Sequence, residues 1–288
     1  MASILGGITS SHIPAVGNAI AEGKTQEPYW KRFFDGYEPA KAWLDAVKPD
    51  VLIVVYNDHG LNFFLDKVPT FALGCADVYE NADEGWGLKP VAPFTGDAEF
   101  SWHLAESLVE QEFDICTCQE MKVDHGFVNP IRALYGNREE GSGDSWPIKT
   151  IPLAVNTVQH PVPSAARCLK LGQALGKAIE SYPEDLRVVI LGTGGMSHQL
   201  QGERAGLINV DFDLECMERI ISEPEWMTQF SNAEIMAQAG TEGIETIMWL
   251  VMRGALADDA KLIHKHYHVP ISNTGAGVLV LENERLSY

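Results

Sequence analysis

Apolar runs and amphipathic stretches alternate along the chain, and this pattern predicts an α/β fold. Short apolar or β-branched runs predict buried strands at 3–9, 51–56, 70–74, 115–118, 151–158, 187–191 and 277–281. Longer segments with helical periodicity predict helices at 39–48, 99–112, 164–182 and over most of 211–254. The alternation predicts a central mixed β-sheet that is flanked by helices and carries its active site at the strand ends.

Three other stretches lack both periodicities. Residues 23–37 are aromatic and irregular, and residues 136–147 are polar and glycine-rich. Residues 76–98 contain repeated Gly, Pro and acidic residues, and a loop of this length in a compact domain is usually functional or mobile. No internal repeat or clear linker interrupts the chain, so residues 1–288 are expected to form a single domain.

The charge balance narrows the choice of partners. The chain of 288 residues has 40 acidic and 21 basic side chains, a formal net charge of −19. This balance argues against nucleic acid and against an anionic membrane surface. An anionic substrate would therefore need local hydrogen-bond donors. The five cysteines form no C-x-x-C pair, and neither a signal-peptide pattern nor a membrane-length apolar run is present, so we expect a cytoplasmic protein.

Candidate chemistry begins where the predicted strand 187–191 ends. Gly192, Gly194 and Gly195 allow a sharp turn there, and His198 follows them. A dinucleotide-binding fingerprint is excluded, because Ser197 stands where its last glycine would be. A nucleophile elbow is excluded as well, because Gln199 replaces its final glycine. The remaining feature is a histidine presented on a glycine-rich turn.

Two more histidines occupy equivalent positions. His12 follows the strand predicted at 3–9, and His59 follows the strand predicted at 51–56. Strand ends on one edge of a sheet converge, so His12, His59 and His198 are expected to meet there. Each of them could instead be an ordinary hydrogen-bonded loop histidine. A further histidine, His125, stands in a predicted turn at 123–126.

Glu245 is the candidate carboxylate. Thr241 could cap a helix that runs to about Gly254, and Glu245 would share one face of that helix with Met248, Trp249 and Met252. A carboxylate on an apolar face is costly to bury unless it is paired or bound to a metal. A buried salt bridge or a bond from a backbone N–H group would also satisfy it.

Two histidines and one carboxylate on separate elements match the facial triad of non-haem Fe(II) enzymes, and zinc is the alternative metal. A rival cluster consists of His264, His266 and His268, whose alternation would place three imidazoles on one face of a strand. The simpler interpretation of that cluster is an exposed, partly charged segment leading to Pro270.

Five segments, taken together in this order, are specific. They are 9–14 (Thr-Ser-Ser-His-Ile-Pro), 56–59 (Tyr-Asn-Asp-His), 83–87 (Asp-Glu-Gly-Trp-Gly), 192–199 and 272–274 (Ser-Asn-Thr). With this set the chain resembles the protocatechuate 4,5-dioxygenase β chains, a family of class III extradiol ring-cleaving dioxygenases. The resemblance extends over nearly the whole chain.

The resemblance implies a role for each candidate residue. It implies that the iron ligands are His12, His59 and Glu245, that the catalytic acid/base is His198, that the substrate carboxylate contacts Ser272 and Asn273, and that a further active-site histidine is His125. The resemblance argues against the cluster of His264, His266 and His268 as the metal site, because the family pattern has only His268 in that segment.

The implied reaction is the Fe(II)-dependent opening of a carboxylated catechol ring by O₂, which yields a ring-opened semialdehyde acid in aromatic (lignin) catabolism. Protocatechuate is the first expectation for the substrate. Gallate or 3-O-methylgallate is the alternative, because residues 60–64 are bulkier than in the protocatechuate enzymes and resemble gallate-cleaving relatives. The resemblance also implies a separate small α chain over the site and an oligomer. A zinc hydrolase and a non-catalytic scaffold chain are the readings from other classes.

Overall fold

The central sheet contains eight strands, and its four middle strands run parallel to one another. The computed structural model describes residues 1–85, 87 and 90–283. The strands are β1 (Ser3–Ser10), β2 (Val51–Tyr56), β3 (Phe71–Gly74), β6 (Cys116–Cys118), β7 (Lys149–Val155), β8 (Arg187–Thr193), β9 (Lys261–Ile271) and β10 (Thr274–Glu282). Two short strands, β4 (Val78–Tyr79) and β5 (Phe94–Thr95), pair separately.

The strand order explains why distant parts of the sequence meet. The order is β6-β3-β7-β2-β8-β1-β10-β9, so β8 lies between β1 and β2. The carboxyl ends of these three parallel strands therefore share one edge of the sheet. β10 is antiparallel to β1, which brings the turn between β9 and β10 to the same edge. The sheet is mixed, as the sequence predicts.

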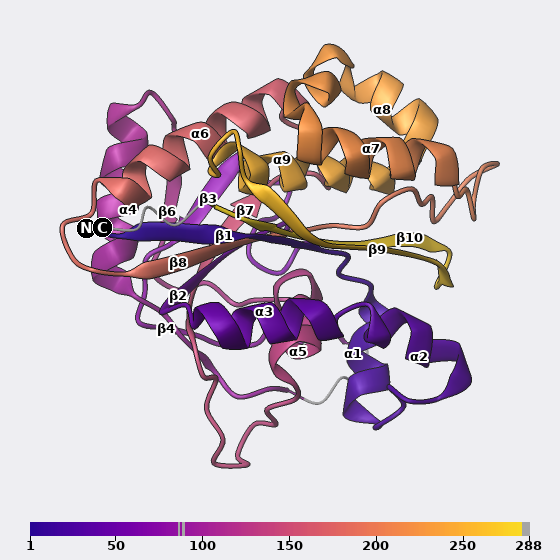
Figure 1. Cartoon of the computed structure of the whole chain (residues 1–288), viewed down its shortest axis with the longest axis horizontal. Coiled ribbons are helices and arrows are strands. Elements are labelled where there is room, and N and C mark those ends of the chain that lie inside the picture. The colour runs from indigo at the N-terminus through magenta and orange to yellow at the C-terminus, as the bar shows by residue number, and fades with distance from the viewer. Residues whose placement is uncertain (86, 88–89, 284–288) are drawn as a thin grey trace.

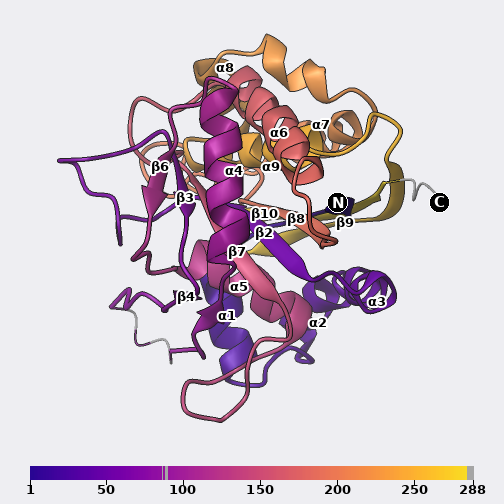
Figure 2. The ribbon, with the colours of Figure 1, turned by 90° about the vertical axis from the view of Figure 1, so that its left-hand side faces the viewer.

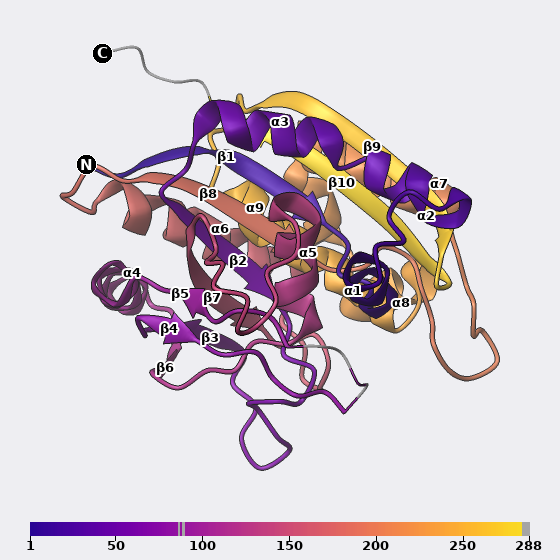
Figure 3. The ribbon, with the colours of Figure 1, turned by 90° about the horizontal axis from the view of Figure 1, so that it is seen from below.

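Helices cover both faces of the sheet (Figure 1). The helices are α1 (Pro14–Ala21), α2 (Pro28–Asp35), α3 (Glu38–Val47), α4 (Ala98–Glu110), α5 (His125–Tyr135), α6 (Ala165–Glu180), α7 (Val210–Ser222), α8 (Asn232–Ala239) and α9 (Ile247–Gly254), with the 3₁₀ turns η1 (Pro224–Gln229) and η2 (Glu242–Thr246). Helices α1, α2, α3 and α5 lie on one face, which Figure 3 shows from below. Helices α4 and α6 to α9 pack on the other face, with α4 beside α6 (Figure 2).

The alternation along β2 shows how the sheet divides the core. All six residues of β2 are buried. Val51, Ile53 and Val55 point into the cluster beneath α4, α6 and α9, and Leu52, Val54 and Tyr56 point into the cluster beneath α3 and α5. Successive side chains of a strand point to opposite faces, so a run that is apolar at every position is typical of a strand covered on both sides.

Three helices, α1, α2 and α5, were not predicted from the sequence pattern. Residues 23–37 contain α2, whose buried residues are Phe33 and Phe34, too few for a wide apolar stripe. His125 does not stand in a turn but is the first residue of α5. Nearly all of α5 is buried, and although its apolar positions have helical spacing, Pro130 within it argues against a helix.

Two local expectations were also wrong. Thr241 does not cap a helix with its side chain, and Glu245 lies in the 3₁₀ turn η2 that precedes α9. The segment with His264, His266 and His268 is more than an exposed stretch, and it does place three imidazoles on one face of a strand, as their alternation indicated. It forms much of β9, which pairs with β10, and its imidazoles stack with ring centroids 6.4 and 6.3 Å apart.

Among the described residues, no helix is both long enough and apolar enough to cross a membrane.

Candidate metal centre

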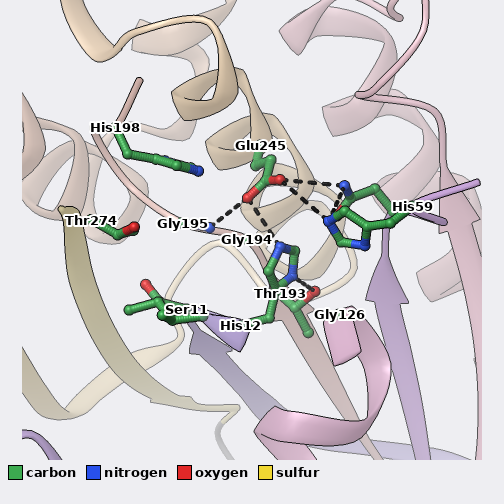
Figure 4. A network of polar contacts seen from close by, with 12 residues as sticks. Ser11, His12, His59, Gly126, Thr193, Gly194, Gly195, His198, Glu245 and Thr274 are labelled. Carbon is green, nitrogen blue, oxygen red and sulfur yellow. Dashed lines mark hydrogen bonds and ion pairs between the residues drawn. The ribbon is translucent and has the colours of Figure 1, made fainter. Parts of the chain in front are cut away.

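Two histidines and a buried carboxylate meet where β1 and β2 end. His12 Nε2 lies 3.1 Å from one carboxylate oxygen of Glu245, and His59 Nε2 lies 4.0 Å from the other. Figure 4 shows the three side chains pointing toward one another from three separate elements. The convergence expected from the strand ends is therefore present in the structure. The role of these residues as metal ligands stays a prediction.

The imidazoles of His12 and His59 each make a hydrogen-bond contact through Nδ1, on the side of the ring away from Glu245. The Nδ1 atom of His12 contacts Thr193 Oγ1 at 3.0 Å, and that of His59 contacts Asp124 Oδ2 at 3.0 Å. The rings of His12 and His59 are close to perpendicular, with centroids 5.3 Å apart. An outer partner on Nδ1 fixes the ring orientation and leaves Nε2 for the centre, which is the usual arrangement of metal-binding histidines.

His125 also reaches the centre. One ring nitrogen from each of His12, His59 and His125 lies within 4.8 Å of the other two, and within the described ranges this is the one group of histidine, cysteine or acidic side chains so placed. The Nδ1 atom of His125 lies 2.6 Å from Glu84 Oε2, and its backbone N–H donates to Glu84 Oε1 at 2.7 Å. His125 and Glu245 are therefore both candidates for a third ligand.

The Glu245 carboxylate is buried and strongly anionic. One oxygen accepts the Gly195 N–H at 2.8 Å, and the other accepts the Asn57 side-chain amide at 3.3 Å. Burial raises the pKa of Glu245, but the neighbouring histidines together, His12 foremost, hold this pKa well below its usual range. Gly194 (φ 129°) is required beside it, since a Cβ there would lie 2.9 Å from the Cβ of Glu245.

The carboxylates also set the charge of the imidazoles. Burial lowers the pKa of His12 below its ordinary value, against the effect of Glu245. Burial acts in the same direction on His59, but the Asp124 carboxylate outweighs it and raises the pKa of His59 to about 9. Burial raises the pKa of Asp124, yet His59 lowers it to about 2. Asp124 is thus an anion that orients His59 from outside the centre.

The donor set fits a divalent transition metal. A buried carboxylate costs free energy unless a positive charge lies near it, and here the nearest ionisable groups are the imidazoles of His12 and His59. Imidazole nitrogen together with one carboxylate suits Fe(II) and zinc, and two histidines with one carboxylate leave open coordination positions on one side. The side chains that would hold such an ion are His12, His59 and Glu245, with His125 beside them.

His198 lies across the cavity from these residues (Figure 4). Its Nδ1 lies 2.8 Å from the carbonyl oxygen of Met196. A carbonyl only accepts, so Nδ1 carries the proton and Nε2 has the lone pair in the neutral ring. The ring packs on Gly195, where a Cβ would lie 2.6 Å from Cε1 of His198. His198 is therefore oriented as a base with a fixed tautomer.

A cavity of about 1040 Å³ joins these groups. Its lining includes the predicted residues His12, His59, His125, His198, Glu245 and Ser272. Ser272 and Asn273 form the two-residue turn between β9 and β10, both with positive φ (51° and 55°). Asn273 is exposed and does not line this cavity. The structure thus brings Ser272, but not Asn273, to the site.

Several residues at the centre were not singled out from the sequence. Asp124, Glu84 and Thr193 hold the three imidazoles, and Asn57 holds Glu245. Asp124 caps α5, and a helix start there would have drawn attention to it. Glu84 falls in the 83–87 segment of the family resemblance, but no local pattern indicates its partner. Trp86 of the same segment lies outside the described residues.

Comparisons with known proteins agree with this chemistry. Residues 6–279 match the family model for the catalytic LigB subunit of aromatic ring-opening dioxygenase. A gallate dioxygenase of Pseudomonas putida is 44% identical over 202 residues, which cover 70% of this chain and 58% of that protein. A 2,3-dihydroxyphenylpropionate/2,3-dihydroxicinnamic acid 1,2-dioxygenase of Comamonas testosteroni is 27% identical, covering 85% of this chain and 87% of its own.

A solved structure shows a similar fold. It is that of an uncharacterized protein from Escherichia coli K12, with a TM-score of 0.57 and 12% identity, and the match covers 96% of this chain and 99% of that chain. At this identity the likeness concerns the fold alone, and it supports a single α/β domain with a large mixed sheet flanked by helices.

Removal of a ligand should abolish tight metal binding. We expect His12→Ala and Glu245→Gln to raise the Kd for Fe(II) about a hundredfold or more, since even outer partners of ligands contribute about 10- to 100-fold. Anaerobic titration with Fe(II) measures the Kd. His264→Ala, on β9, is the matched control and should bind Fe(II) like the unaltered protein.

The same titration distinguishes the two candidates for the third ligand. If Glu245 is the ligand, His125→Ala should weaken Fe(II) binding far less than Glu245→Gln does. The reverse order would assign the position to His125, and full binding by Glu245→Gln would refute the carboxylate assignment.

Proposed function

The chain belongs to the family of catalytic LigB subunits of aromatic ring-opening dioxygenases, and we propose that it opens the ring of gallate with O₂, using Fe(II) held by His12, His59 and Glu245. The observation that carries the proposal is the meeting of two imidazoles and one buried carboxylate in a large cavity. The class of activity follows from the family. The substrate and the metal are proposals.

Gallate is better supported than protocatechuate, which the sequence alone placed first. The support is the 44% identity to a gallate dioxygenase, although the matched region spans only 58% of that protein. The bulky residues of segment 60–64 support gallate less strongly than the composition of the segment indicates. Leu61 lines the main cavity, whereas Phe63 and Phe64 line a smaller cavity of about 480 Å³ beside it. Of this segment Gly60 and Leu61 line the main cavity, so Leu61 is its one bulky side chain that can contact a substrate there.

Bound Fe(II) would supply one centre at which the diol and O₂ meet in a defined orientation. The protein supplies the proton transfers. His198 Nε2 faces the cavity and is unprotonated in the neutral ring, so it can accept a proton from a substrate hydroxyl and return one later. An imidazole suits both directions near neutral pH.

Recognition of the substrate carboxylate would rest on neutral donors. The net charge of −19 repels an anion, so the contact must be local. Ser272 lines the cavity from the turn between β9 and β10, which places it at the rim. We propose Ser272 as the main carboxylate contact, and Asn273 as a weaker one because it lies outside the cavity lining.

The partners follow as proposals from the same family. They are a small aromatic diol acid, O₂, a small chain that covers the site and further copies of this chain. A cytoplasmic location likewise stays an expectation. A zinc hydrolase with the same ligands would bind zinc and turn over without O₂, and a scaffold chain would bind no metal, so metal analysis separates these alternatives from the proposal.

Gallate should be the preferred substrate. After anaerobic loading with Fe(II), we expect O₂ uptake with kcat/KM roughly two- to tenfold higher for gallate than for protocatechuate, the worth of one net hydrogen bond to the extra hydroxyl. The same O₂-uptake assay is run with 3-O-methylgallate, the third candidate substrate. A higher kcat/KM for protocatechuate would restore the first expectation, and no O₂ uptake with any of the three would refute the proposed function.

Loss of the base should impair turnover without loss of the metal. We expect His198→Ala to lower kcat about a hundredfold or more, the usual contribution of a positioned acid/base, with the Fe(II) Kd unchanged. Steady-state O₂ uptake and the Fe(II) titration together test this. Loss of Fe(II) binding would identify His198 as a ligand instead.

Removal of the Ser272 hydroxyl should weaken carboxylate recognition. We expect Ser272→Ala to raise the KM for gallate about tenfold or more, as for a hydrogen bond to a charged group, and to change pyrogallol turnover little because pyrogallol lacks the carboxylate. Asn273→Ala is the neighbouring comparison and should have the smaller effect. Equal losses on gallate and pyrogallol would show that Ser272 shapes the site without contacting the carboxylate.

A further inference from the structure

A further buried carboxylate, that of Asp213, contacts the turn that carries His198. Asp213 belongs to the first turn of α7 and is 1% exposed. One of its oxygens accepts the Ser197 N–H at 2.8 Å. The other accepts the Ser197 hydroxyl at 2.6 Å and the Tyr267 hydroxyl at 2.7 Å. Asp213 therefore binds two segments that are far apart in the sequence.

The two segments joined by Asp213 also contact each other. Met196 N–H donates to the Gly275 carbonyl at 3.0 Å, and Gly275 N–H donates to the Ser197 carbonyl at 2.9 Å. The fit around Gly275 is close, because a Cβ on it would lie 2.3 Å from Asp213 Oδ2. The backbone at Gly275 thus packs directly on the carboxylate.

Each segment carries one half of the proposed active site. Ser197 immediately precedes His198, the proposed acid/base. Tyr267 belongs to β9, whose hairpin with β10 carries Ser272 and Thr274 on the cavity wall. The halves touch at Gly195, where a Cβ would lie 2.6 Å from the His198 ring and 2.9 Å from Thr274. Figure 4 shows His198 and Thr274 on the same side of the cavity.

Packing alone gives no reason for a carboxylate at this position. Burial of a charge is costly, and apolar residues of similar volume are often at least as stabilising. Among the ion pairs between described residues, none provides Asp213 with a cation, and its hydrogen-bond donors there are the N–H and hydroxyl of Ser197 and the hydroxyl of Tyr267. A fully bonded polar group of this kind fixes one relative position of the elements it joins.

We propose that Asp213 is a positioning residue that sets the distance between His198 and the β9–β10 hairpin, and so aligns proton transfer with recognition of the substrate carboxylate. The inference rests on the proposed function, because it takes His198 as the acid/base and Ser272 as the carboxylate contact. Asp213 itself touches neither substrate nor metal and acts through Ser197 and Tyr267.

Single variants can loosen the two attachments separately. Tyr267→Phe removes the hairpin attachment alone, so the KM for gallate should rise about tenfold while kcat changes little. Ser197→Ala removes the hydroxyl bond on the His198 side, so kcat should fall about tenfold on gallate and on pyrogallol alike. Asp213→Asn leaves one acceptor oxygen where the carboxylate offers two, so the donors of Ser197 and Tyr267 are no longer all satisfied. This variant should show both the higher KM for gallate and the lower kcat.

Matched controls separate positioning from general damage. Asp211→Asn removes an exposed carboxylate from the same turn of α7. Tyr135→Phe removes a buried tyrosine hydroxyl that has no hydrogen-bond partner in the described part of the chain. Both should leave kcat and KM unchanged. The Fe(II) Kd should be unchanged in every variant, since Asp213 is not among the side chains of the metal centre.

A double-mutant cycle then tests whether the two attachments act as one unit. If Asp213 couples them, Ser197→Ala and Tyr267→Phe combined should change kcat/KM by a factor that differs from the product of the single effects. Thermal melting shows which variants fold. Should Asp213→Asn fail to fold, Tyr267→Phe, which loses one hydroxyl, still decides the question.

The outcomes distinguish this inference from the proposed function. If the unaltered chain takes up O₂ with gallate but Tyr267→Phe leaves the KM for gallate unchanged, or impairs pyrogallol equally, the positioning role is wrong. If the unaltered chain has no activity, the proposed function is wrong, and hydrogen exchange of the 195–199 backbone is the remaining readout. Faster exchange in Tyr267→Phe than in Tyr135→Phe supports the coupling, and equal exchange refutes it.

Discussion

The structure depends first on one buried negative charge, the carboxylate of Glu245. A carboxylate in the interior is unfavourable unless positive charge and donors surround it. Here its surroundings are the imidazoles of His12 and His59, the Gly195 N–H and the Asn57 amide. These groups come from the ends of three neighbouring parallel strands, so the order β2-β8-β1 is what makes the burial of Glu245 tolerable. A divalent metal ion would complete the compensation.

The sequence predicted the parts of this site that local patterns determine. The strands of residues 51–56 and 187–193 stand out because they are covered on both faces, and a histidine or glycine turn past such a strand has a known position at the sheet edge. The meeting of His12 and His59 could therefore be expected from the pattern, whereas their grouping with Glu245 as one ligand set came from the family resemblance. The roles of Asp124, Glu84 and Asp213 could not be expected, because each is defined by a partner that only tertiary packing supplies.

The errors in secondary structure have the same origin. α5 has Pro130 in its interior and buries its polar residues His125, Asn129 and Arg132 along with its apolar ones, so its environment differs from that of a surface helix. β9 is rich in His and Lys because much of it is only half-buried, yet its pairing with β10 makes it a long strand. In both cases the neighbouring elements that pack on the helix or pair with the strand decide its structure, and a local sequence pattern does not reveal those neighbours.

The two sides of the cavity are built from different kinds of structure. Parallel strand ends and η2 form the metal side, whereas the turn of an antiparallel hairpin forms the side that carries Ser272. Parallel strand ends are fixed by neighbours on both sides, but a two-residue turn tolerates substitution and small shifts. The substrate side can therefore change with little effect on the metal centre, provided that the hairpin stays attached to the His198 turn. The family match gives the class of chemistry, and we expect the preference for one ring over another to depend on the hairpin that carries Ser272.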